Sequence, residues 1–128
     1  MKIAIRSFWP GIIWWVLSVI AFCIPGSALP KEDWLGKIHF DKIIHIGLFA
    51  GMVFLWCLPL IYRQNRKSLS NLFLKITALF FGYGVAMEFI QHSFVSRRSF
   101  DWGDIVADAV GCLIGLFLAR RQWLTASN

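Results

Sequence analysis

Apolar residues run through most of this chain, and short polar stretches divide them into four long segments. The segments cover about residues 8–24, 41–62, 72–94 and 101–119. Each is close to the roughly 20 residues that a helix needs to cross the hydrocarbon core of a bilayer. Pro25 ends the first segment, a basic stretch over 63–71 separates the second from the third, and Arg120 and Arg121 stop the fourth. We therefore predict an all-α protein built as a bundle of four transmembrane helices.

The first apolar segment is open to a second interpretation as a cleaved signal peptide. Lys2 and Arg6 precede it, and the small residues Gly26, Ser27 and Ala28 follow it, which is the order of a leader and its cleavage region. The segment carries three tryptophans and its neighbours are also apolar enough to span a membrane. We therefore expect a retained first helix, while cleavage within residues 1–28 stays open.

Composition places the chain among membrane proteins. Of its 128 residues 58% are hydrophobic, with a mean hydropathy of +0.63. This length predicts a single domain over residues 1–128. The net charge of +6 does not indicate nucleic-acid binding, because the basic residues are dispersed and form no groove interleaved with aromatics. The three cysteines have no ligand-like spacing, so the sequence predicts neither a zinc site nor a disulfide framework.

The distribution of charge predicts a topology in which both termini are cytoplasmic. With that orientation the inner side receives eight of the thirteen basic residues and none of the seven acids. An excess of Lys and Arg on the cytoplasmic side is the usual rule for multi-pass proteins. These inner basic residues are Lys2, Arg6, Arg63, Arg66, Lys67, Lys75, Arg120 and Arg121.

The fourth segment carries two stripes of unusual residues. Asp101, Asp104 and Asp108 are spaced by three and four residues, so on one helix their carboxylates share a face. Beside them runs a stripe of small residues that lets another helix approach closely. Its members are Gly103, Ala107, Gly111 and Gly115.

Two other segments carry polar residues at a matching depth. Asp41, Lys42 and His45 project from one side of the first turn of the second segment, and Glu88 and Gln91 share a face near the end of the third. A carboxylate at the centre of a membrane helix costs about 2.5 to 3.5 kcal/mol, so such residues are expected to turn inward. We predict one polar site inside the bundle, shared by the three helices and open to the outer side of the membrane.

These residues together resemble a known family. Asp41-Lys42-x-x-His45, Glu88-x-x-Gln91 and Arg98-x-x-Asp101-x-x-Asp104-x-x-x-Asp108-x-x-Gly111-x-x-x-Gly115 are similar to the motifs of the VanZ-like family of small bacterial integral membrane proteins. The resemblance covers residues 41–115. It implies a four-helix protein of the bacterial cytoplasmic membrane, associated in the name-giving member with resistance to the glycopeptide teicoplanin. It supplies no reaction, and Asp108 stands where the family often has Asn.

The motif residues divide into candidate roles. Five carboxylates against Lys42 and Arg98 leave an excess of three negative charges, so one or more should be protonated or neutralised by a divalent cation. A protonated carboxyl beside an ionised one could serve in acid and base catalysis. The catalytic candidates are His45, Glu88, Asp101 and Asp104. The substrate-binding candidates are Asp41, Lys42, Gln91, Arg98 and Asp108. A carboxylate metal site could use Glu88, Asp101 and Asp104.

Three functions fit these residues. The first is a protein of cell-envelope physiology that contacts the bilayer and binds a lipid-linked precursor or a glycopeptide. The second is an enzyme acting on a phosphate- or sugar-bearing envelope lipid, and the third is an ion-coupled transporter. No nucleophile motif identifies an enzyme. Plainer interpretations are a packing role for His45 and a structural ion pair of Glu88 with Arg98 or Lys42. The oligomeric state is open.

Overall fold

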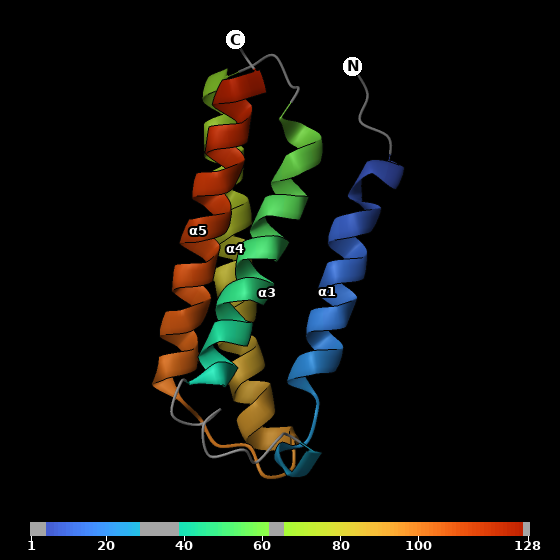
Figure 1. Ribbon diagram of the computed structural model, residues 1–128, viewed down its shortest axis with the longest axis vertical. Helices are drawn as coiled ribbons and strands as arrows, with labels where there is room; N and C mark the ends of the chain where they lie inside the picture. Colours follow the sequence, from blue (N-terminus) through green and yellow to red (C-terminus); the bar gives the residue numbers. More distant parts are fainter. Residues whose placement is uncertain (1–4, 29–38, 62–65, 127–128) are drawn as a thin grey trace.

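The computed structural model describes residues 5–28, 39–61 and 66–126, and these residues form helices without any strand (Figure 1). The prediction of an all-α bundle is confirmed, since four helical stretches are long and apolar enough to cross a membrane. The long helices are α1 (Trp9–Phe22), α3 (Phe40–Cys57), α4 (Arg66–Phe94) and α5 (Trp102–Ala126). Short 3-10 turns are η1 (Ile5–Phe8), η2 (Gly26–Ala28) and η3 (Leu58–Leu60).

Several predicted boundaries were wrong because charge and helical structure end at different places. The basic stretch 63–71 was expected to separate the second and third helices, but α4 already begins at Arg66. Arg120 and Arg121 do not end the last helix, which continues to Ala126. Arginine is a good helix former, so basic residues show where a span leaves the hydrocarbon and do not break the helix. Conversely, α3 ends at Cys57, and the 3-10 turn η3 carries the span on to Leu60, since Pro59 has no N–H to donate to a carbonyl oxygen four residues earlier.

The stripe of small residues brings α5 into contact with the backbone of α3. A Cβ atom added to Gly111 would lie 2.6 Å from the carbonyl oxygen of Ile46, and one added to Gly115 would lie 2.6 Å from that of Ala50. Figure 1 shows the two helices side by side along much of their length. The predicted close approach is therefore confirmed, and α3 is the partner.

Helix α1 packs on the other side of α3 through tryptophans. Trp14 covers Gly51 and donates a hydrogen bond from Nε1 to the Leu48 carbonyl oxygen at 2.9 Å, while Trp56 covers Gly11. The opposite face of α1 exposes large apolar side chains that suit contact with lipid. These side chains include Ile13, Val16, Leu17 and Ile20.

The ends of the helices define two ends of the bundle. The beginning of α1 and the end of α5 lie at one end, and the beginnings of α3 and α5 lie at the other with the end of α4 (Figure 1). The side of the membrane that each end faces remains a prediction from the charges. Two of the residues that support it, Lys2 and Arg63, are outside the described residues.

Replacing Gly111 by Ala should destabilise the bundle, because the new methyl group would meet the Ile46 backbone, which cannot rotate away. We expect a loss of about 1–3 kcal/mol in the free energy of unfolding, as for other overpacked cores. Denaturation of the purified protein in detergent micelles measures it. Gly82→Ala in α4 is the control, since its Cβ would meet nothing within 4 Å. Equal stability of the two variants would contradict backbone contact between α3 and α5.

Topology can be read from single cysteines placed at Ser99 and Asn71. Both side chains are exposed and belong to opposite ends of the bundle, and Cys23 should first be replaced because it is exposed whereas Cys57 and Cys112 are buried. We expect a membrane-impermeant maleimide to label Ser99→Cys in intact cells and to spare Asn71→Cys. The opposite pattern would reverse the topology and place the polar site in the cytoplasm.

Candidate functional site

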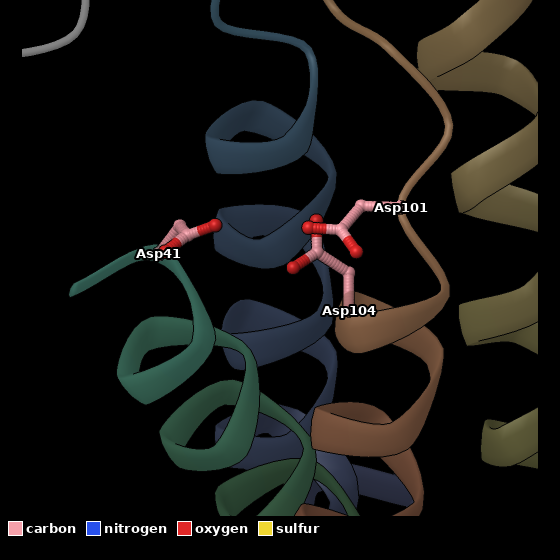
Figure 2. A group of neighbouring side chains, drawn as sticks. All are labelled: Asp41, Asp101 and Asp104. Carbon is pink, nitrogen blue, oxygen red and sulfur yellow. The ribbon is translucent and has the colours of Figure 1, made fainter. Parts of the chain in front are cut away.

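Lys42 lies among three carboxylates at the end of the bundle where α3 and α5 begin. Its Nζ atom is 2.7 Å from Asp101 Oδ2, 3.2 Å from Asp104 Oδ1 and 3.3 Å from Asp41 Oδ2. Figure 2 shows these acids approaching one another from the start of α3, the segment before α5 and the first turn of α5. One ammonium group is thus the shared counter-charge of three acids. We call Asp41, Lys42, His45, Glu88, Asp101, Asp104 and Asp108 the polar cluster.

Asp101 has a structural task besides its ion pair. It was predicted to open the last helix, but it precedes α5, and its Oδ1 accepts a hydrogen bond from the Gly103 N–H at 2.7 Å. An aspartate in this position satisfies a backbone donor that the first turn of a helix leaves unpaired. The Lys42 ammonium, followed by the Gly103 N–H, lowers the pKa of the Asp101 carboxyl. Asp101 therefore caps α5 as an ionised group.

His45 lies deeper, between two carboxylates of α5. Its Nδ1 atom is 2.7 Å from Asp108 Oδ1, and its Nε2 atom is 3.8 Å from Asp104 Oδ2. All three side chains are buried, with Asp108 the most enclosed. Solvent exposure falls from Asp41 to His45, because the spacing of four residues puts His45 one helical turn further into the bundle.

Gly84 makes room for this pair, and the sequence analysis missed it. A Cβ at Gly84 would lie 2.5 Å from Asp108 Oδ2, so the carboxylate fits against α4 only because no side chain is present. The available signal was its position four residues before Glu88, which puts both on one face of a helix. Gly82, two residues earlier, points into open space.

Glu88 connects α4 to the segment before α5. Its Oε1 accepts a hydrogen bond from the Asp101 backbone N–H at 2.5 Å, and the side chain is only 2% exposed. Its other oxygen, Oε2, is buried and has no hydrogen-bond partner among the described residues. The contacts found for Glu88 in the described chain include no ion pair with Lys42 or Arg98. Its structural contact is instead the hydrogen bond with the Asp101 backbone.

Gln91 and Arg98 stand beside the polar cluster and anchor the chain that follows α1. Gln91 is buried and donates from Nε2 to the Phe22 carbonyl oxygen at 2.9 Å. Arg98 donates from Nε to the Ile24 carbonyl oxygen at 3.4 Å. Within the described residues neither side chain has a hydrogen bond or ion pair with an acid of the polar cluster. Their predicted roles in substrate binding stay predictions.

The contacts change the charge balance that the sequence suggested. Among the described residues the polar cluster holds five carboxylates and one ammonium group, that of Lys42, which leaves four negative charges when all five acids are ionised and His45 is neutral. Such a cluster complements a cation or a group rich in hydroxyls or amines. A phosphate would be repelled unless a cation accompanied it.

The arrangement of three acids also fits a divalent cation. Asp41, Asp101 and Asp104 each offer an oxygen atom within 4.8 Å of the others, and Mg²⁺ and Ca²⁺ prefer oxygen ligands. The site predicted from the sequence had Glu88 in place of Asp41, but Glu88 is engaged with the Asp101 backbone. The Lys42 ammonium lies between the same carboxylates, so a bound ion would take its place. It would supply the positive charge that a phosphate needs.

Replacing Lys42 by Met should make the stability of the protein depend on divalent cations, because three carboxylates lose their shared counter-charge. We expect millimolar Ca²⁺ or Mg²⁺ to raise the melting temperature of Lys42→Met and to leave that of the unaltered protein nearly unchanged. Lys75→Met is the control, since Lys75 is exposed on α4 and belongs to no ion pair found in the described chain. An equal response of both variants to the ions would argue against a cation site at these acids.

Comparison with known proteins gives one family and one distant relative. The family model described as VanZ/LLP1 matches residues 5–124. A Schizosaccharomyces pombe protein, described as uncharacterized protein C11E3.10, is 36% identical over 80 residues, which are 61% of this chain and 45% of the relative. The chain thus spans less than half of the length of that relative, and the similarity is not confined to bacteria. No solved structure matches the chain.

Proposed function

The chain belongs to the VanZ/LLP1 family, and from this premise we propose that it binds the headgroup of an envelope lipid at the polar cluster and transfers protons there. The substrate class we assign is a lipid-linked sugar or amino sugar. Four helices long and apolar enough to span a membrane support a multi-pass protein, and the polar cluster lies near the ends of three of them. A lipid headgroup could therefore reach the cluster while its chains remain in the membrane.

The observation that carries this proposal is the geometry of His45. With Asp108 ionised and His45 neutral, the carboxylate only accepts hydrogen bonds, so His45 Nδ1 would carry the hydrogen of the 2.7 Å contact between them. Nε2 of the neutral ring is then left as an acceptor. At 3.8 Å from Asp104 it is too far for a direct hydrogen bond, so it is available to a substrate proton. A base oriented by a buried carboxylate is a recurring arrangement in catalysis.

The surrounding groups favour a hydroxyl- or amine-bearing headgroup. Asp41 and Asp101 have side chains that are 46% and 44% exposed, so they can meet a ligand before the buried residues do. Carboxylates accept hydrogen bonds from sugar hydroxyls and pair with amines. Lys42 pairs with both of these exposed acids and with Asp104, which lies beside His45. A ligand that moves from the exposed acids to His45 would therefore rearrange these ion pairs.

The proposal extends to resistance against glycopeptides in a bacterial cytoplasmic membrane. With the predicted topology the polar cluster faces the envelope, where lipid-linked cell-wall precursors and teicoplanin both occur. Modifying or binding such a precursor would alter the target that the glycopeptide recognises. Simple binding without turnover, to a precursor or to the glycopeptide itself, is the rival from a different functional class.

A transport role has less support from the interior of the bundle. The buried polar side chains among the described residues are Ser18, His45, Glu88, Gln91, Asp104 and Asp108. Beyond Asp108 towards the end of α5, the buried side chains described on α3 and α5 are apolar or Cys. They are Met52, Val53, Cys57, Cys112, Leu116 and Ala119. Along these two helices the described buried side chains offer an ion or proton no polar relay, which favours a site served from one face.

His45→Gln should abolish turnover of a lipid-linked sugar, because the amide cannot accept and release a proton as the imidazole does. The purified protein is incubated with lipid-linked cell-wall precursors, and products are followed by mass spectrometry. We expect a fall of about 10²-fold or more, in line with the loss of a general base. His92→Gln is the control, since His92 is exposed at the same end of α4 and outside the polar cluster.

The outcomes separate the functional classes. A product that persists in His92→Gln and disappears in His45→Gln supports catalysis. Precursor binding without a product would indicate a binding protein and not an enzyme. If the protein neither binds the precursor nor forms a product, the proposal is overturned. In a susceptible bacterium, the same pair of variants should separate teicoplanin resistance in the same way. Resistance that survives in His45→Gln would disconnect the polar cluster from that phenotype.

A further inference from the structure

A second site lies at the opposite end of the bundle, near the end of α5. An open groove of about 470 Å³ is lined by Phe117, Arg120, Arg121, Leu124 and Thr125. Phe117, Arg120, Arg121 and Leu124 follow the spacing i, i+3, i+4 and i+7, so they form one face of the helix. Two guanidinium groups are thus set between apolar side chains on a single surface.

The two arginines have no acidic partner among the described residues. Arg120 donates from Nη2 to Ser70 Oγ at 3.3 Å, which holds its guanidinium between α5 and α4. Its Nε atom is buried and has no hydrogen-bond partner within the described chain. Arg121 is exposed, and its carbonyl oxygen accepts a hydrogen bond from Thr125. Two unneutralised guanidinium groups, one of them fixed in position, favour an anion.

The apolar part of the groove indicates what kind of anion it is. Phe117 is 63% exposed and lies about one turn closer to the middle of the span than Arg121, and Leu124 is also exposed. A free phosphate would use the arginines and leave Phe117 uncovered. A phospholipid would use both, with its phosphate on the guanidinium groups and an acyl chain along Phe117.

We propose that this groove binds the phosphate headgroup of an anionic phospholipid. The site is separate from the polar cluster, which lies where α5 begins, and it does not depend on the function proposed for that cluster. Two positive charges with no acidic partner in the described part of the chain select net-negative lipids over zwitterionic ones, because the cationic part of a zwitterionic headgroup opposes the attraction.

Native mass spectrometry of the full chain, released from mixed micelles of phosphatidylglycerol and phosphatidylcholine, tests this site. We expect preferential retention of phosphatidylglycerol, and a loss of roughly fivefold per arginine in Arg120→Gln/Arg121→Gln, as for a basic residue at a membrane surface. Arg6→Gln is the control, since it removes an exposed charge at the same end of the bundle but outside the groove.

Equal retention of both lipids, or an equal loss in Arg6→Gln, would overturn the proposal in favour of a diffuse surface charge. Displacement of the lipid by millimolar inorganic phosphate would overturn the assignment to a lipid. Where the double Gln variant fails to fold, the single variant Arg121→Gln decides, because Arg121 is exposed. It removes one of the two charges, so reduced retention of phosphatidylglycerol supports the site and unchanged retention overturns it.

Discussion

Burying carboxylates inside an apolar bundle is the constraint on which this structure depends. Each acid needs a donor or counter-charge within reach, because lipid supplies neither. Lys42 serves three acids, His45 serves Asp108, and the backbone of Asp101 serves Glu88. These contacts join α3, α4 and α5 at one end. The same contacts bring acid and base groups together, so satisfying the charges and assembling the candidate site are one event.

The sequence predicted the helices and the residues of the cluster for a clear physical reason. Long apolar runs allow few structures in a membrane, and a charge inside such a run is rare enough to stand out. The close approach of another helix to α5 also followed from the spacing of Gly111 and Gly115, although the sequence did not identify α3 as that helix. What these patterns specify is the face of a helix, which is a local property of the chain.

The partners of individual side chains could not be predicted in the same way. The family resemblance put Arg98 among the acids, whereas its guanidinium bonds to the Ile24 carbonyl. Asp101 was assigned to a helix that it caps. Both residues fall in the segment between α4 and α5, where no helical period constrains the direction of a side chain. Gly84 was overlooked because its role depends on Asp108, a residue on another helix.

The contact between α3 and α5 has a consequence for the order in which the protein enters the membrane. Helix α5 brings Asp104 and Asp108 into a hydrophobic span, and each acid disfavours insertion. Their partners Lys42 and His45 belong to a helix that is synthesised earlier. During biogenesis Lys42 and His45 therefore lack their α5 partners until α5 emerges from the ribosome. The close contact at Gly111 and Gly115 would then let α5 dock on α3 as it enters the membrane, so that its insertion would draw on protein contact as well as on partitioning into lipid.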